Sequence, residues 1–554
     1  MQVHKKKMRL SAVLLTLALG AAACGGGDSD SGGSGAKGGD EGASGGTFSY
    51  TVTNPENPLI PGNTTESEGS QIIAALFTNL ITYDVETSKA KMDGVAESIK
   101  SDDSTLWTIK LKDGWKFHDG TPVDAESFVA AWNYTALSTN AQGGSYFFEN
   151  VEGYKDLQAE TDDNDVVTKE PTSKALSGLK VVDPKTFTVK LAAPFAQYPI
   201  TLGYNAFAPL PKAFFADPEA FGTKPIGNGP FKADEAFRQD IGFKLTRFEG
   251  YGGEKAKADA VDIKIIPDVN TAYTEVQAGG LDILDTVPPE VIASAPGEFG
   301  KRFIERSSSS FTYMGFPTYD PRYQDKKVRQ AFSMAIDRPA ITKAIFNGTR
   351  EPAYSVVSPV VDGSRKDACK FCKYDPAAAK KLLAETGFDT SKPIDLWFNA
   401  GAGHDAWVTA VGNQLRENLG ITYTLKGDLK FGEYLPVGRG KKFTGPFRLG
   451  WSMDYPSPQN YLEPLYTEAA LPPGSNTAFY VNPAFDKKVK DGNSAKSNDE
   501  AIKIYQQAED ILLEDMPIMP MFFGKLQAVH SEKVSNVKFD AFGQCDLANV
   551  TVKK

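Results

Sequence analysis

The residues with the clearest chemical potential are a cation and a carboxylate, Arg448 and Asp454, which flank one short apolar segment. Leu449 and Trp451 alternate with smaller or polar neighbours between them, as in a buried strand. A carboxylate at the end of such a strand can bind an ammonium group, and a guanidinium can bind a carboxylate. Because a proline follows closely, support of a turn explains Asp454 equally well from spacing alone.

Local signals predict the elements around this segment. Pro456 ends the strand, and Ser457-Pro458 is typical of a helix N-cap followed by proline at the first helical position. Elsewhere, alternating strand-like and helix-like runs indicate a mixed α/β chain. Strands are expected at 47–52 and 261–266, helices at 70–80, after Asp124, at 270–278 and at 501–513, and a hairpin joining 106–111 to 115–117.

Length and composition indicate a large globular protein. The 554 residues are 41% hydrophobic and 23% charged. This length exceeds what one core usually supports, so two or three domains are expected. The net charge of −10 argues against nucleic-acid binding, which needs a basic face.

The N-terminus carries a targeting signal. A basic start is followed by an apolar run at 10–23, which is short for a membrane span. Three alanines before Cys24 resemble a bacterial lipobox, although Ala21 departs from the usual leucine. An ordinary cleavage site beside a bystander cysteine is the alternative. We expect residues 1–24 to be a lipoprotein signal peptide with Cys24 as the lipidation site, and the Gly- and Ser-rich residues 25–46 to be a flexible linker.

A series of short motifs runs through the rest of the chain. They are Val95-Ala96-Glu97-Ser98, Trp107-Thr108-Ile109, Lys116-Phe117-His118-Asp119-Gly120-Thr121-Pro122-Val123, Phe128-Val129-Ala130-Ala131-Trp132, Gly227-Asn228-Gly229-Pro230-Phe231-Lys232, Lys327-Val328-Arg329-Gln330-Ala331-Phe332, Ala335-Ile336-Asp337-Arg338, Tyr374-Asp375-Pro376, Ser475-Asn476-Thr477-Ala478 and Pro483-Ala484-Phe485-Asp486. In this order they resemble the signature of the family 5 extracellular solute-binding proteins, the receptors of peptide-type ABC importers. Within the family, the oligopeptide-binding members are the most similar.

This resemblance implies a two-lobed α/β fold of the periplasmic-binding-protein type II, three-domain peptide-binding cluster, with a ligand cleft between the lobes. Domain I would be discontinuous, and domain II would be inserted into the same lobe. Domain III would form the second lobe. The implied boundaries are 47–76, 213–309 and 525–554 for domain I, 77–212 for domain II and 310–524 for domain III.

The resemblance also implies charged ligand-binding residues. Asp454 would hold the amino terminus of a peptide. Arg448, Arg439 and His404 would meet ligand carboxylates of different reach. An exposed loop is an equal alternative for Arg439 and for His404. Phe346 stands where relatives have a further cleft lysine, so the carboxyl end of the ligand would be read differently here.

Backbone groups and aromatic rings complete the implied cleft. Gly450 and Ser452 would offer backbone groups to an extended ligand. Tyr146 would come from the opposite lobe, and Phe431 or Tyr434 would replace a cleft tryptophan. Core packing is the alternative for each aromatic side chain.

The remaining motifs argue against an enzyme. Cys369 and Cys372 form a lone C-x-x-C pair, and zinc would need two more ligands at suitable spacing. In an oxidising exterior a local disulfide is expected, with Cys545 left as a free thiol unless it pairs with one of the two. His118 lies beside an Asp-Gly turn, which favours a structural role. Beyond the Gly- and Ser-rich linker the sequence contains no G-x-S-x-G motif, and it contains no H-E-x-x-H or Walker motif, so no catalytic residue, metal or cofactor is expected.

These observations predict a monomeric, lipid-anchored binding protein on the outer face of a bacterial cell membrane. It would capture oligopeptides by hinge closure and deliver them to an ABC permease with its ATPase subunits. Two alternatives remain. The same fold could bind a non-peptide ligand, such as an oligosaccharide, a metallophore complex or an opine-like compound. The chain could also be a surface sensing or adhesive protein.

Overall fold

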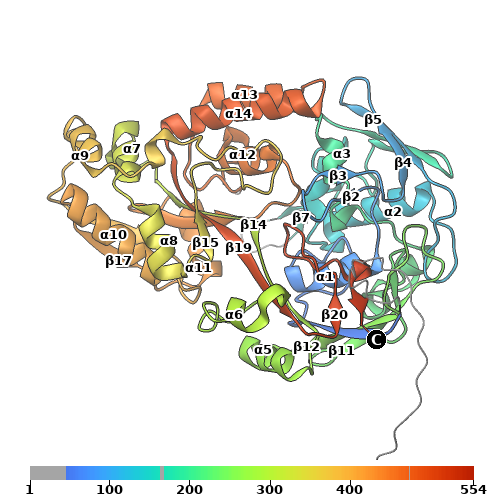
Figure 1. The fold of residues 1–554 in the computed structure, drawn as a ribbon. Coiled ribbons are helices and arrows are strands. Elements are labelled where there is room, and N and C mark those ends of the chain that lie inside the picture. Colours follow the sequence, from blue (N-terminus) through green and yellow to red (C-terminus); the bar gives the residue numbers. More distant parts are fainter. Residues whose placement is uncertain (1–44, 162–166, 473, 554) are drawn as a thin grey trace, which may run out of the picture. The chain divides into compact units, whose positions relative to one another are not determined.

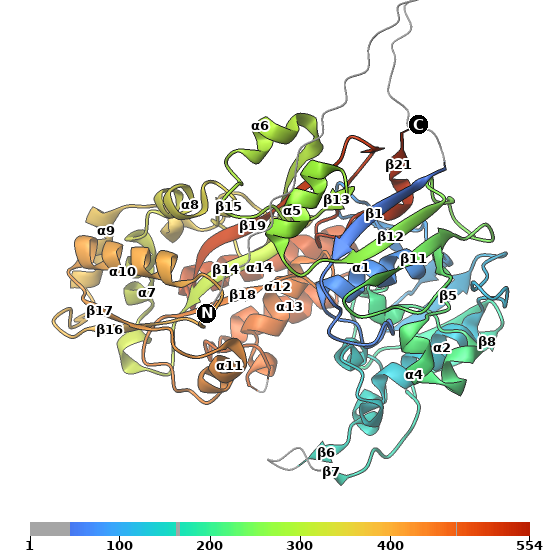
Figure 2. The ribbon, with the colours of Figure 1, turned by 90° about the horizontal axis from the view of Figure 1, so that it is seen from below.

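The computed structural model describes residues 45–161, 167–472 and 474–553. Its main element is an 11-stranded mixed sheet (Figures 1 and 2). The expected signal peptide, Cys24 and nearly all of the expected linker lie outside the described residues. The strand order is β10 (Phe231–Ala233), β11 (Gly242–Arg247), β12 (Ala260–Ile265), β1 (Thr47–Val52), β13 (Ile283–Leu284), β19 (Ile518–His530), β14 (Phe303–Gly315), β18 (Phe447–Trp451), β16 (Ile394–Trp397) and β17 (Tyr423–Lys426), with β15 (Arg350–Pro352) paired to β19.

Two long antiparallel strands, β14 and β19, connect the two parts of this sheet. The first half of β14 pairs with the second half of β19, which also pairs with β13. The second half of β14 pairs with β18 as well as with β19. A register shift between Ser307 and Phe311 interrupts the β14–β19 pairing in the middle. The expected domain boundaries after residues 309 and 524 therefore fall inside continuous strands.

A second sheet forms where local signals are strong. It contains four antiparallel strands in the order β4 (Ala96–Lys100), β5 (Leu106–Leu111), β9 (Thr186–Lys190) and β8 (Leu179–Asp183). Helix α2 (Ala125–Ala136) begins at Asp124, whose carboxylate accepts a hydrogen bond from the Ser127 N–H in a capping box. Phe128 and Trp132 on this helix are fully buried.

The predicted hairpin at 106–117 is wrong. Strand β5 pairs with β4 and β9, whereas Lys116 forms an isolated bridge with Pro122. The alternation of buried Trp107 and Ile109 identifies the strand correctly. It does not identify its partners, because β9 lies far along the chain. The helix expected at 70–80 is α1 (Ser67–Leu76), which ends where Phe77 becomes extended.

Fourteen α-helices pack around the sheets in the described ranges, and no helix there is long and apolar enough to cross a membrane. Besides α1 and α2 they are α3 (Tyr198–Thr201), α4 (Pro218–Thr223), α5 (Val269–Ala278), α6 (Ala295–Phe299), α7 (Lys326–Met334), α8 (Arg338–Phe346), α9 (Pro376–Ala384), α10 (Asp405–Leu419), α11 (Phe431–Arg439), α12 (Pro458–Tyr466), α13 (Pro483–Asn493) and α14 (Asn498–Asp515). Three two-stranded sheets join β2 (Thr82–Tyr83) to β3 (Ala90–Lys91), β6 (Glu160–Thr161) to β7 (Val167–Lys169) and β20 (Val534–Ser535) to β21 (Thr551–Val552).

The buried side chains form separate cores. The first gathers β1, α1, α2 and the four-stranded sheet, together with the C-terminal segment. Two others gather elements between residues 311 and 523. A smaller one lies under α5 and α6. Tyr455 belongs to the first core although its near neighbour Met453 belongs to the second, so the chain passes from one core to the other at this point.

The Gly227-Asn228-Gly229 motif is explained by close packing against the end of α1. A Cβ atom at Gly227 would lie 1.8 Å from the Leu76 carbonyl oxygen, so only glycine fits. The Gly227 N–H donates to His118 Nδ1 at 3.0 Å, and His118 Nε2 lies 3.3 Å from the Gly229 carbonyl. His118 is therefore engaged in holding this loop.

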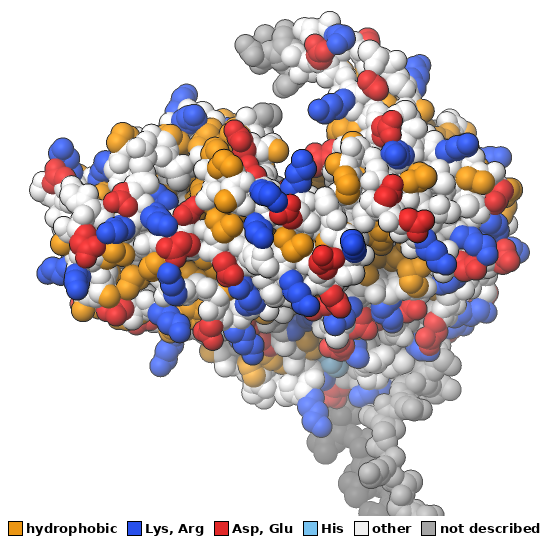
Figure 3. Space-filling model, turned by 90° about the horizontal axis from the view of Figure 1, so that it is seen from above, with side chains coloured by type: hydrophobic (Ala, Val, Ile, Leu, Met, Phe, Trp, Pro, Cys, Tyr) orange, Lys and Arg blue, Asp and Glu red, His pale blue; other side chains and the backbone are white. Residues whose placement is uncertain are grey.

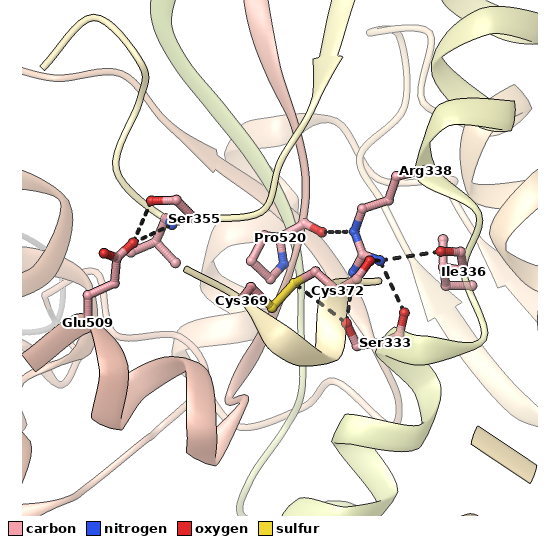
Figure 4. The surroundings of a disulfide bond; sticks show 9 residues. Ser333, Ile336, Arg338, Ser355, Cys369, Cys372, Glu509 and Pro520 are labelled. Atoms are coloured by element: carbon pink, nitrogen blue, oxygen red, sulfur yellow. Dashed lines mark hydrogen bonds between the residues drawn. A yellow bond between two sulfur atoms is a disulfide. The ribbon is translucent and has the colours of Figure 1, made fainter. Parts of the chain in front are cut away.

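Cys369 and Cys372 are joined by a disulfide, and both are buried (Figure 4). Beside it the Arg338 guanidinium, 1% exposed, donates to the carbonyl oxygens of Cys372 at 2.8 Å and Pro520 at 2.5 Å and to the Ser333 hydroxyl at 2.8 Å. Backbone carbonyls thus satisfy this buried cation. Cys545 is a buried free thiol.

Candidate ligand-binding site

The turn between β18 and α12 carries Asp454. Helix α12 begins with Ser457 as its N-cap, whose hydroxyl accepts from the Gln459 N–H at 3.0 Å, and with proline at the first position, as the sequence predicts. Met453 and Tyr455, on either side of Asp454, are buried in different cores. The turn is therefore fixed from both sides, which leaves the Asp454 side chain partly buried between them.

Asn460 on α12, 2% exposed, holds this turn in place. Its Oδ1 accepts from the Asp454 N–H at 2.9 Å and from Trp451 Nε1 at 3.1 Å, and its Nδ2 donates to Asp454 Oδ2 at 3.0 Å. The Tyr146 hydroxyl, from the segment after α2, donates to Asp454 Oδ1 at 3.4 Å. Sequence reasoning missed Asn460, although an asparagine two residues inside a capped helix is a recognisable signal.

The electrostatics of Asp454 favour a cationic ligand. Burial raises the pKa of its carboxyl to about 6, while the hydrogen bonds from Asn460 and Tyr146 oppose that rise. Within the described part of the chain, no Lys or Arg contributes to this pKa or forms an ion pair with Asp454. A desolvated carboxylate with no cation beside it is suited to bind an ammonium group.

An aromatic wall faces Asp454. Tyr146, 46% exposed, stacks on Phe147 with 4.3 Å between ring centroids, and Phe147 stacks on Tyr204 at 4.1 Å. Burial raises the pKa of both tyrosines, and the charge of Asp454 adds to the rise. Tyr204 therefore belongs to the surroundings of this carboxylate, although no sequence signal singles it out.

Arg448 and His404 present two unpartnered donors. Arg448 Nη1 donates to Asn399 Oδ1 at 3.1 Å, but its buried Nε has no hydrogen-bond partner among the described residues. His404 Nδ1 accepts from Trp407 Nε1 at 3.3 Å, so the proton of the neutral ring lies on Nε2, which is also buried and unpartnered there. Burial and then the charge of Arg448 lower the pKa of His404 to about 4. Two such donors suit an anionic group.

One edge of β18 is open next to Gly450. Strand β14 covers the other edge, while β16 pairs with β18 only at Phe447. On the β16 side the buried Tyr434 hydroxyl lies 3.2 Å from the Trp397 carbonyl and 2.9 Å from the Arg448 carbonyl. Alternate residues of a strand face the same edge, so the Gly450 N–H and C=O also point to this side. An extended chain can pair with them.

Comparison with known proteins decides the family. Residues 92–471 match the model of the bacterial extracellular solute-binding proteins, family 5 (middle region), which is more than half of the chain. The chain belongs to family 5 of the bacterial extracellular solute-binding proteins. This membership confirms the family resemblance and identifies a binding protein rather than an enzyme.

Relatives and solved structures agree with this assignment. The solute-binding protein is 28% identical over 472 residues to the periplasmic oligopeptide-binding protein OppA of Salmonella typhimurium, covering 82% of each chain. It is 25% identical over 530 residues to the dipeptide-binding protein of Escherichia coli K12, covering 90% of this chain and 92% of the relative.

Two solved structures confirm the α/β fold class. The periplasmic murein tripeptide-binding protein MppA in its unliganded open form matches with a TM-score of 0.79 at 23% identity, over 92% of this chain and 99% of the other. Haemophilus influenzae OppA in complex with RPPGFSPFR matches with a TM-score of 0.68 at 22% identity, over 92% and 99%.

The other expected site residues of this solute-binding protein are less connected. Arg439 and Phe431 lie exposed at opposite ends of α11, and Ser452 is exposed just after β18. In the described ranges no hydrogen bond or ion pair links Arg439 to the other expected site residues. Their roles, like the domain boundaries, stay predictions.

A cation lies next to Phe346. The Phe346 ring packs on Phe522 at 4.8 Å between centroids, and the Arg350 guanidinium lies 5.7 Å from the Phe346 centroid. Phe522 in turn packs against Trp407 at 5.3 Å, which bonds His404. A series of ring contacts thus links Arg350 to His404, although the sequence prediction did not include Arg350.

Proposed function

We propose that this solute-binding protein captures oligopeptides and delivers them to an ABC permease for uptake. Asp454 carries the proposal, because it is a partly buried carboxylate that forms no ion pair with any described Lys or Arg, is held by Asn460 and faces Tyr146. The α-amino group of a peptide would supply the missing charge. The names of the relatives, which include oligopeptide-, dipeptide- and glutathione-binding proteins, support a peptide-like ligand.

The rest of the site suits the remainder of a peptide. The Gly450 N–H and C=O would pair with its main chain as with an added strand. The free donors of Arg448 and His404 would meet its carboxylate, and Arg350 would supply the cation that Phe346 does not. Charge would thus fix the two ends of the ligand, and backbone pairing its middle.

Delivery would follow from closure around the ligand. In this proposal β14 and β19 flex where their pairing is interrupted, and the closed form is the one that the permease and its ATPase subunits recognise. A lipid on Cys24 would keep the protein at the outer face of the cell membrane.

Calorimetry with one peptide in two forms tests this function. The wild type should bind the peptide with a free amino terminus, and Asp454→Ala should weaken this binding by about 2–5 kcal/mol, because it strands a desolvated ammonium. Acetylating the peptide should weaken wild-type binding and have little further effect in the variant. Equal wild-type affinity for both forms would exclude the assigned role of Asp454. Mass spectrometry of co-purifying ligands would reveal a non-peptide ligand.

A further inference from the structure

A second hollow lies at the carboxyl ends of three parallel strands. Strands β12 and β13 both run parallel to β1, and all three end at the rim of a pocket of about 390 Å³. The first turn of α1 and the loop 542–544 close its sides. Crevices outside the carboxyl ends of parallel strands are frequent ligand sites in α/β proteins, and this volume is within their usual range.

The pocket combines apolar walls with two carboxylates. Val52, Ile266, Leu284, Leu526 and Phe542 contribute the walls, and Asp285 and Glu68 the charges, while no Lys, Arg or His is among the lining residues. Asp285 Oδ2 accepts from the buried Tyr50 hydroxyl at 2.7 Å, and Oδ1 accepts from the Thr286 hydroxyl at 3.2 Å. Each oxygen keeps a further lone pair for a ligand.

The charge in this pocket is not balanced within the described chain. Helices α1 and α5 begin at its rim and place partial positive charges there. Glu68 in the first turn of α1 and Asp268 at the N-cap of α5 already offset those partial charges. The negative charge of Asp285 is then left without a compensating positive charge in the pocket. Burial raises its pKa, the charge of Glu68 adds to the rise, and Asp285 forms no ion pair in the described ranges.

The pocket and Asp454 border one region of the molecule. Phe542 lines the pocket and packs against Tyr83 with 5.5 Å between ring centroids. Burial raises the pKa of Tyr83, and the charges of Tyr204 and Asp454 add to this rise. The Tyr83 ring also packs against Gly203, whose neighbour Tyr204 belongs to the aromatic wall that faces Asp454. A continuous series of contacts thus links the pocket to the surroundings of Asp454.

We propose that the pocket receives a basic side chain of the bound peptide. The aliphatic stem of a lysine or arginine would lie along the apolar walls, and its cationic head would reach Asp285 and Glu68. This inference rests on the proposed peptide function and narrows it, because it assigns a preference for peptides that contain a basic residue beyond the amino terminus.

Calorimetry on a scanned peptide series tests the preference. The probes are alanine pentapeptides with free amino termini that carry one lysine at the second, third, fourth or fifth position, each with a matched glutamine peptide. At one position the wild type should bind the lysine peptide at least about tenfold more tightly than its partner, a difference of about 1.4 kcal/mol. Asp285→Asn should bring this ratio close to one without weakening the glutamine peptide, and Glu68→Gln should reduce it in part.

The control is Asp262→Asn, which removes a carboxylate from β12 outside the pocket and should keep the full lysine preference. Thermal melts show whether each variant is folded. The comparison of lysine and glutamine peptides on the wild type remains valid even if a variant does not fold. A wild type with no lysine preference at any position would overturn the inference, as would a preference that survives in Asp285→Asn. If acetylation of the peptide still weakened its binding to the wild type, the proposed peptide function would stand although the inference about the pocket had failed. Failure of every peptide to bind would overturn both.

Discussion

At Asp454 the protein without ligand holds a carboxyl group whose neutral form is favoured by burial. The unfolded chain has the ordinary, lower pKa. An acid whose pKa is raised on folding binds its proton more tightly in the folded state, so stability falls as pH rises from the unfolded pKa to the folded one. Above about pH 6 the penalty is complete. The buried Asp454 carboxylate, which is suited to bind an ammonium group, thus lowers the free energy of unfolding of the ligand-free protein.

Replacing Asp454 by asparagine should therefore stabilise the ligand-free protein near neutrality. At pH 8 the free energy of unfolding should rise by about 1–3 kcal/mol, because the neutral amide avoids the cost of a buried charge. At pH 4 the gain should be small, since the wild-type carboxyl is then largely protonated in the fold. Urea unfolding at the two pH values measures both. Destabilisation of the same size at both pH values would contradict this account.

The pH dependence of peptide binding belongs to the same residue. Affinity for a free-amino peptide should fall as pH drops below about 6, because protonation removes the charge that meets the ammonium group. Asn460→Ala should move this decline to higher pH, since the Asn460 amide stabilises the ionised form. Titration calorimetry from pH 5 to 8 shows the shift. The acetylated peptide serves as the control, and an unshifted decline in the variant would count against Asn460.

At the scale of elements, the start of α12 is where separate parts of the chain meet. Gln197, just before α3, is 1% exposed and accepts a hydrogen bond from the Ser457 hydroxyl. Its Nε2 donates to Asn498 Oδ1 at 2.5 Å, at the start of α14. One buried amide thus joins the starts of two helices, including the one that holds Asp454 in place through Asn460.

Removing the cap of α12 should cost more than removing an ordinary cap. Ser457→Ala loses a capping hydrogen bond, worth about 1 kcal/mol, and strands the buried Gln197 oxygen for about 1–3 kcal/mol more. Ser497→Ala is the matched control, because this exposed serine caps α14 without such a partner and should cost about 1 kcal/mol. Urea unfolding compares the two. Equal losses would show that the Gln197 contact contributes nothing.

Helices with local signals could be predicted from sequence, whereas most contacts between distant residues could not. Asp124 and Ser457-Pro458 mark helix starts because a cap is a contact within one turn. The run Ser307–Ser310 gives no strand signal, yet it lies inside the 13-residue strand β14. Pairing with β19 at both ends of this run, at Ser307 and at Phe311, carries the strand through it, and β19 is encoded far away.

The residues of the candidate site likewise fall into those that could be predicted from sequence and those that could not. Asp454 and Arg448 were found because their strand and turn are local and because the family resemblance points to them. Tyr204 and Gln197 were missed, since their part in the site depends on the folded arrangement of distant segments. Arg350 was missed because its place beside Phe346 depends on packing that no local sequence signal shows.

For the whole molecule, closure should depend on the middle of β14 and β19. A Cβ atom on Gly524 would lie 2.6 Å from Ser308 Oγ and 3.0 Å from Ser310 Cβ, so a larger side chain would wedge the two strands. Small-angle scattering should show a smaller radius of gyration for the wild type with peptide than without it. Gly524→Val should blunt this change and destabilise the fold by about 1–3 kcal/mol through overpacking.

The matched control for that experiment is Gly297→Val. A Cβ atom at Gly297 on α6 meets nothing within 4 Å, so this variant should compact on peptide binding as the wild type does. A wild type that keeps its radius of gyration when peptide binds would argue against hinge closure.

The strand order also sets the time at which the chain can fold. Strand β13 needs β19 as a partner, and Gln71 on α1 bonds both the N–H and the C=O of Cys545. The earliest part of the chain to be synthesised is therefore completed by nearly the last. Contacts of such long sequence separation form slowly, so β13 waits for β19 although β1 can already pair with β12. On a ribosome-bound chain the sheet around β13 and the contact at Gln71 thus stay incomplete until β19 and Cys545 have emerged.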